Sequence, residues 1–104
     1  MKTILCVFGT RPEVIKMAPV IRALSQRGQV NVITCDTGQH RDLCHPVCRW
    51  FGISSNHELG LMTRDQSPVQ FLARALHALD EVLEAATPDW IVCQGDTTTA
   101  MAMA

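Results

Sequence analysis

Charged and hydroxyl side chains gather in three short segments of the sequence, each directly after an apolar, strand-like run. The segments are 9-GTRPEVIK-16, 37-TGQHRD-42 and 95-GDTTT-99. Ligands of open parallel sheets bind beyond the carboxyl ends of the strands, where helix N-termini offer free amide hydrogens and the positive end of the helix dipole. We therefore expect the three segments to line one rim that can hold an anionic ligand.

The first segment has the composition of an anion-binding helix start. Gly9 allows a tight turn, and the guanidinium of Arg11 can pair with two phosphate oxygens. Helical side chains lean toward the N-terminus, so Lys16 could reach the same rim and help to hold a diphosphate. The alternative is that Glu13 and Lys16 form an exposed ion pair while Arg11 is solvated in the first turn.

The third segment supplies a carboxylate. Asp96 follows an apolar run and Gly95, and it precedes the hydroxyls of Thr97, Thr98 and Thr99. At the edge of a sheet, this carboxylate could act as a general base or accept hydrogen bonds from the hydroxyls of a ligand. The alternative is that Asp96 caps the helix that follows, and the sequence leaves both open.

The second segment raises the question of a metal, because four potential zinc ligands follow one another closely: His40, Cys44, His45 and Cys48. Their spacing fits no standard zinc pattern, and no second cysteine or histidine pair follows at a finger-like distance. We therefore expect no metal. The two cysteines should instead pack on a helix face beside Leu43, Val47 and Phe51. His40 and Arg41, at the loop itself, are better candidates for contacting a ligand.

Nucleotide-binding motifs narrow the choice of ligand. Gly9 stands by itself, so the dinucleotide fingerprint G-x-G-x-x-G is absent, although Asp36 lies roughly where a ribose-binding acid would fall. The Walker loop G-x-x-x-x-G-K-[ST] is absent as well. These absences disfavour a nicotinamide-dependent oxidoreductase and an ATPase, and we predict no cofactor.

Segments rich in β-branched residues alternate with longer segments of helical period, a pattern typical of repeated βαβ units. The pattern predicts an α/β fold, a parallel Rossmann-like sheet with flanking helices. Strands are predicted at 3–8, 30–35 and 90–94, with a weak one near 57–61, and helices at 11–27 and 68–86. The run 90–94 is apolar enough to predict a strand buried on both faces.

Capping signals and apolar stripes define the two long helices. Thr10 with Glu13, and Ser67 with Gln70, match the capping-box spacing, and Gly28 should end the first helix. The predicted buried face of the first helix comprises Val14, Met17, Ala18, Ile21 and Leu24. That of the second helix comprises Val69, Leu72, Leu76, Leu79, Leu83 and Ala86.

Length and composition fit one small soluble domain of 104 residues, 47% of them hydrophobic, with a net charge of −1. Because nucleic acid and anionic membranes require a basic excess, we expect neither as a partner. No run approaches the roughly 18 apolar residues of a membrane span, and cysteines placed in strand-like runs favour the reducing cytoplasm. The final 100-AMAMA-104 makes barely one helical turn, so we expect a piece of a longer protein.

Three stretches, 8-FGTRPEVIKMAP-19, 37-TGQHRD-42 and 87-TPDWIVCQGDTTTA-100, resemble the non-hydrolysing UDP-N-acetylglucosamine 2-epimerases. The resemblance spans essentially the whole chain. It implies that residues 1–104 are an incomplete N-terminal Rossmann-like domain of the two-domain GT-B fold type, with the C-terminal domain absent from this chain. It also implies a homodimeric parent enzyme of cell-envelope polysaccharide biosynthesis that interconverts UDP-GlcNAc and UDP-ManNAc by eliminating UDP and adding it back.

By the same resemblance, Arg11 and Lys16 would contact the diphosphate side of the substrate, and Asp96 would lie at the sugar as an acid/base or positioning carboxylate. Gln39 and His40 match a loop associated in bacterial members with a second, activating UDP-GlcNAc. The family's other catalytic groups lie beyond residue 104, so we expect the chain alone to be inactive. The alternative is a non-catalytic module that binds nucleotide sugars or pairs with an epimerase subunit.

Overall fold

The computed structural model describes residues 1–95 and 97–104, and for Arg41 the backbone alone. The described residues form a four-stranded sheet in the order β3-β2-β1-β4, in which every neighbouring pair is parallel. The strands are β1 (Lys2–Phe8), β2 (Val30–Asp36), β3 (His57–Glu58) and β4 (Trp90–Val92). The predicted α/β fold with a parallel sheet is confirmed, and the carboxyl ends of its strands share one edge.

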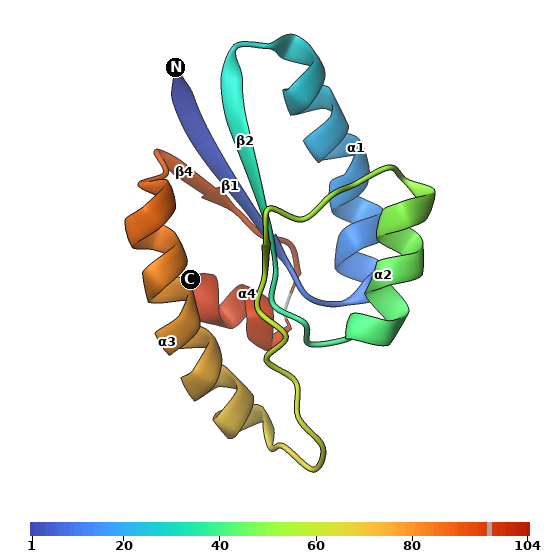
Figure 1. Cartoon of the computed structure of the whole chain (residues 1–104), viewed down its shortest axis with the longest axis vertical. Coiled ribbons are helices and arrows are strands. Elements are labelled where there is room, and N and C mark those ends of the chain that lie inside the picture. The colour runs from blue at the N-terminus through green and yellow to red at the C-terminus, as the bar shows by residue number, and fades with distance from the viewer. Residues whose placement is uncertain (96) are drawn as a thin grey trace.

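Helices cover both faces of the sheet (Figure 1). On one face lie α1 (Arg11–Arg27) and α2 (Arg41–Trp50), and on the other α3 (Pro68–Ala86) and α4 (Thr98–Met103). Alternate residues of β1 serve the two layers: Leu5 and Val7 pack beneath α3 and α4, whereas Cys6 and Phe8 pack beneath α1. A central strand buried on both faces requires an unbroken apolar run, and 4-ILCVF-8 provides one.

The long helices begin and end where their capping signals place them. Ser67 Oγ accepts a hydrogen bond from the Gln70 amide at 3.1 Å, and Gln70 Oε1 accepts one from the Ser67 amide at 2.9 Å. The C-terminus of α1 is at Gly28, whose φ of 69° is the left-handed conformation that glycine adopts without strain. The described residues form no helix that combines the length and apolarity a membrane crossing requires.

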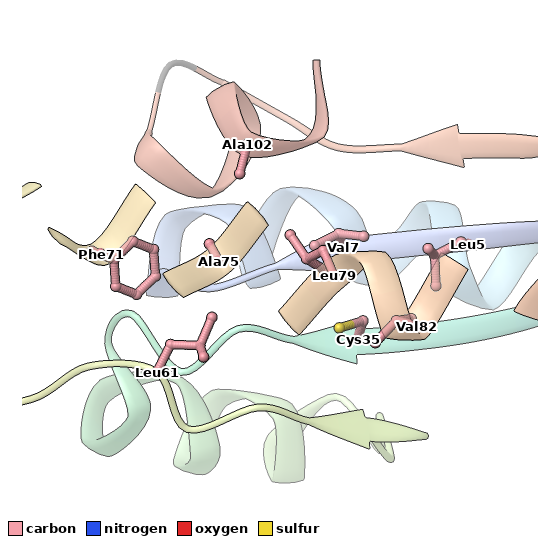
Figure 2. Close-up of a cluster of buried hydrophobic side chains, with 9 residues drawn as sticks. All are labelled: Leu5, Val7, Cys35, Leu61, Phe71, Ala75, Leu79, Val82 and Ala102. Atoms are coloured by element: carbon pink, nitrogen blue, oxygen red, sulfur yellow. The ribbon is translucent and has the colours of Figure 1, made fainter. Parts of the chain in front are cut away.

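The buried face of α1 is the predicted one, whereas that of α3 was predicted only in part. Leu79 is buried, and Leu72 and Leu83 are partly buried against the same cluster. Val69 is 75% exposed and Leu76 is 51% exposed, although both were expected in the core. The sheet is instead contacted by Phe71, Ala75, Leu79 and Val82 (Figure 2). Helix α3 carries two apolar stripes of helical period that share Leu79, so periodicity alone could not choose between them. Packing on β1, β2 and α4 decides the rotation of the helix.

The prediction that run 90–94 is a strand buried on both faces is wrong. Only Trp90–Val92 form β4, and among the described residues this strand pairs with β1 alone, so it lies at an edge of the sheet. Trp90 is accordingly 67% exposed. The weak strand predicted near 57–61 is present as the two-residue β3 at the opposite edge. An apolar run therefore indicates a strand here without fixing its place in the sheet.

Candidate functional site

The loops that follow β1, β2 and β4 meet at the carboxyl edge of the sheet, as predicted. We call this junction the rim, formed by residues 9–11, 37–40 and 97–99. Two backbone hydrogen bonds join the first two loops, from the Thr37 amide to Phe8 O at 2.9 Å and from the His40 amide to Gly9 O at 2.7 Å. The third loop is joined through Thr99, whose hydroxyl lies 2.9 Å from Thr37 Oγ1 and donates to Gln39 Oε1 at 2.7 Å.

Gly9 is required by close packing at the rim. A Cβ atom placed there would collide with Thr37 Oγ1 and would lie 2.6 Å from Thr99 Oγ1. Both threonines are fully buried, so neither has open space to move into. The glycine therefore lets the β1–α1 loop touch the other two loops.

Glu13, in the first turn of α1, forms four hydrogen bonds to rim residues, and its long-range contact was not predicted. Its side chain is turned inward, and the residue is 1% exposed. Oε1 accepts hydrogen bonds from the amides of Gly9 at 3.0 Å and Thr10 at 2.9 Å, and from Thr10 Oγ1 at 2.9 Å. Oε2 accepts one from Thr97 Oγ1 at 2.6 Å. The proposed exposed pair of Glu13 with Lys16 is therefore wrong.

This arrangement changes how the rim can hold an anion. The sequence predicted that amide hydrogens at the start of α1 would be free for a ligand, yet those of Gly9 and Thr10 donate to Glu13. The positive end of the helix already faces a carboxylate from its own first turn. An external anion therefore cannot use these two amides.

Two cationic side chains are available for that purpose. Arg11, the first residue of α1, and Lys16, in the next turn, are both exposed, and neither forms an ion pair with a carboxylate of the described residues. Burial raises the pKa of the Cys44 thiol to about 12, and the positive charge of Arg11 partly opposes that rise. Asp96 lies outside the described residues.

The N-cap position of α4 is occupied by Thr97. Its hydroxyl accepts a hydrogen bond from the Ala100 amide at 3.3 Å while donating to Glu13. Thr97 and Thr99 thus serve the fold directly, one as a cap and the other as a buried link between loops. The sequence could identify these hydroxyls but not their partners.

Gln39 and His40 border a cavity beside the rim. The cavity measures about 380 Å³ and is lined by Gly38, Gln39, His40, Asp42, Leu43, Gly60 and Met62. Gln39 is half-buried, and its side-chain oxygen Oε1 accepts a hydrogen bond from the hydroxyl of Thr99. His40 is exposed at the N-cap position of α2. The β2–α2 loop therefore contributes to both the rim and this cavity.

The candidate metal ligands are separated by the fold. Cys44 and Cys48 point into the core formed with Cys6, Phe8 and Val14, which confirms that they pack on a buried helix face, although Leu43 is 51% exposed. His45 Nε2 instead lies 3.7 Å from Asp36 Oδ2 and 3.8 Å from Glu58 Oε1. No group of three His, Cys, Asp or Glu side chains within the described ranges could hold a metal ion.

Asp36 is buried, whereas a ribose-binding acid would be open to its ligand. The residue is 1% exposed, and Oδ1 accepts a hydrogen bond from the Gly38 amide at 2.9 Å, within its own loop. Its second oxygen is directed to His45 of α2. This orientation removes the one feature that had favoured a dinucleotide.

Replacing Gly9 with alanine is expected to lower the free energy of unfolding by about 3 kcal/mol, because the added methyl group overpacks the buried threonine pair. Urea denaturation measures the change. Gly28→Ala is the matched control: its φ of 69° strains a side chain, but the new Cβ meets no atom within 4 Å, so the loss should be only about 1 kcal/mol. Equal losses in the two variants would contradict the packing argument at the rim.

Comparison with known proteins supports one family. The family model for UDP-N-acetylglucosamine 2-epimerase matches residues 22–104. UDP-N-acetylglucosamine 2-epimerase of Yersinia pestis is 43% identical over 98 residues, which cover 94% of this chain and 26% of that protein.

Solved structures agree with the sequence comparison. The crystal structure of UDP-GlcNAc 2-epimerase from Neisseria meningitidis bound to UDP-GlcNAc superimposes with a TM-score of 0.91 at 40% identity, over 96% of this chain and 27% of that one. That of the Methanocaldococcus jannaschii enzyme in complex with UDP-GlcNAc and UDP gives a TM-score of 0.87 at 28% identity, over 98% and 28%. This chain thus spans about a quarter of the length of its relatives. By its sequence motifs, parallel sheet and matched family model, the chain belongs to the UDP-N-acetylglucosamine 2-epimerase family.

Proposed function

We propose that this chain forms the N-terminal part of the nucleotide-sugar site of an enzyme that interconverts UDP-GlcNAc and UDP-ManNAc. The observation that carries the proposal is the rim, where three βα loops are hydrogen-bonded together at the start of α1, the helix that carries the exposed residues Arg11 and Lys16. This is the edge at which parallel α/β sheets bind nucleotides. Relatives crystallised with UDP-GlcNAc share the fold at 28 to 40% identity, which supports the same class of ligand.

Arg11 and Lys16 are assigned to the diphosphate. Glu13 already uses the amides of Gly9 and Thr10, so the side chains of Arg11 and Lys16 are the positive groups that we assign to the phosphates. Negative charge develops on UDP as its bond to the sugar breaks, and fixed cations lower the barrier to that step. The guanidinium of Arg11 suits two phosphate oxygens, and Lys16 adds a second positive charge.

Asp96 is assigned to the sugar as an acid/base or positioning carboxylate. Inversion at C2 requires a proton to be removed from one face of the sugar and delivered to the other, so more than one group must act. A single carboxylate cannot meet that requirement. We therefore propose that the other groups come from a second domain of a GT-B-type enzyme, which acts in the cytoplasm as a homodimer.

The cavity beside the rim is assigned to a second nucleotide sugar. Gln39 and His40 contribute to its lining, and its volume of about 380 Å³ falls within the range of small-molecule sites. Gln39 also bonds Thr99 at the rim, so a ligand in the cavity would contact the same loop that shapes the rim. Through that shared loop, an activating ligand in the cavity would influence how the substrate binds at the rim.

Isothermal titration calorimetry of the purified chain with UDP and with UDP-GlcNAc tests the proposal. We expect binding of both, weakened about tenfold by Arg11→Ala or by Lys16→Ala, since each removes one charge-assisted contact to phosphate. Arg27→Ala is the matched control, because Arg27 lies in the last turn of α1, far from the rim, and its loss should leave the affinity unchanged. A coupled epimerase assay should detect no turnover by the chain alone.

Two results would overturn the proposal. One is the absence of heat with either ligand, which would leave a structural or pairing role for the chain. The other is equal weakening of binding by Arg27→Ala and Arg11→Ala, which would indicate attraction by net charge rather than a site.

A further inference from the structure

We propose that Glu13 is a positioning residue that couples the loop before Arg11 to the loop that contains Thr97, and so sets the shape of the rim. The proposal rests on the proposed function, because the rim matters only if a nucleotide binds there. Glu13 is assigned no contact with the ligand. Its role is to hold two segments that are 84 residues apart in the sequence at a fixed distance.

The second capping box of the chain shows what such a motif does by itself. Gln70 occupies the equivalent position of α3, where it is exposed and accepts one hydrogen bond, from the amide of Ser67. Glu13 is buried and accepts four hydrogen bonds, one of them from a distant loop. Closing the first turn of a helix requires only the local contacts. The long-range contact to Thr97 therefore indicates an additional role.

In the hydrogen bond between Thr97 and Glu13, the threonine hydroxyl must be the donor. A carboxylate can only accept hydrogen bonds, and all four atoms around it are donors. Thr97 donates its hydroxyl hydrogen to Glu13 and accepts from the Ala100 amide with the same oxygen. The hydroxyl of Thr97 thus acts as a donor to α1 and as an acceptor within α4, so it connects the starts of the two helices.

The link through Thr97 can be removed without dismantling the rim. Thr99 joins the third loop to the second through Thr37 and Gln39, independently of Glu13. Thr97→Val removes the hydroxyl while keeping the shape of the side chain, and Thr97→Ser restores the hydroxyl. Ser67→Ala is the control for the lost helix cap, because Ser67 caps α3 through the Gln70 amide and lies outside the rim.

The experiment measures UDP affinity by calorimetry and amide hydrogen exchange by NMR on the purified chain and the three variants. We expect Thr97→Val to weaken UDP binding about fivefold and to speed exchange at Gly9 and Thr10, whose amides donate to the now less constrained Glu13. Thr97→Ser should restore both values. Ser67→Ala should lower stability comparably, by about 1 kcal/mol, and leave both values unchanged.

Each remaining outcome decides against the proposal. Unchanged exchange at Gly9 and Thr10 in Thr97→Val would show that the two loops are not coupled. Faster exchange with unchanged UDP affinity would show that the coupling does not position the nucleotide site. If the wild-type chain binds no UDP, the proposed function fails, whereas the exchange rates still show whether Glu13 couples the loops.

Discussion

Raising the pH from about 8 to about 10 is expected to lower the free energy of unfolding by roughly 5 kcal/mol, because four buried thiols resist ionisation in the folded chain. Burial raises the pKa of Cys6 and Cys48 from 9.0 to about 11. It raises those of Cys35 and Cys44 to about 12, with a further contribution from the charge of Asp36. A loss of this size approaches the whole stability of a small domain.

The sign follows from the direction of these shifts. Below pH 9 the thiols are protonated in both the folded and the unfolded chain, so they add no pH dependence. Above pH 9 the unfolded chain loses its thiol protons while the folded chain keeps them until pH 11 to 12. Stability is therefore fully present below pH 9 and falls as the pH rises toward the folded values.

The amino-acid composition leaves few groups other than thiols that titrate between about pH 8 and 10. The chain has no tyrosine and only two lysines, so thiols dominate titration in this range. Urea denaturation at about pH 8, 9 and 10, in the presence of a reducing agent, follows the loss. Cys44→Ala removes one of the four thiols and should reduce the pH-dependent loss by about 1.4 kcal/mol per pH unit above pH 9. A free energy of unfolding that stays constant between pH 8 and 10 would refute the argument.

Replacing Phe71 with alanine is expected to lower the free energy of unfolding by about 4 kcal/mol. Phe71 is 2% exposed and lies in the cluster with Leu5, Val7 and Leu79 between α3 and the sheet (Figure 2). Truncation of its ring removes buried apolar surface and leaves a cavity that close-packed neighbours fill only in part. Urea denaturation at neutral pH gives the change in midpoint and slope.

Leu76→Ala is the matched control on the same helix. Leu76 is 51% exposed, and alanine is a good helix former, so this change should cost less than about 1 kcal/mol. The pair of variants distinguishes the observed face of α3 from the face predicted by the leucine pattern. A larger loss for Leu76→Ala than for Phe71→Ala would show that the helix is rotated in solution.

Local signals in the sequence determined the limits of the long helices. Thr10, Ser67 and Gly28 are caps whose partners lie within a few residues, so their effect can be read without knowing the fold. The apolar runs likewise predicted that β1, β2 and β4 are strands, but not their order in the sheet. The family motifs and the parallel sheet were sufficient to predict that three loops meet at one edge.

Only the tertiary structure decided which face of α3 is buried, where β4 lies in the sheet, and that Glu13 binds Thr97. Each of these depends on partners distant in the sequence. Two stripes of α3 have the same period, a strand's place depends on which neighbours pair with it, and the capping-box spacing specifies only the near contacts of a glutamate. Local sequence patterns reflect interactions between residues that are near in the sequence. Where those interactions allow several arrangements of similar energy, tertiary packing selects one of them.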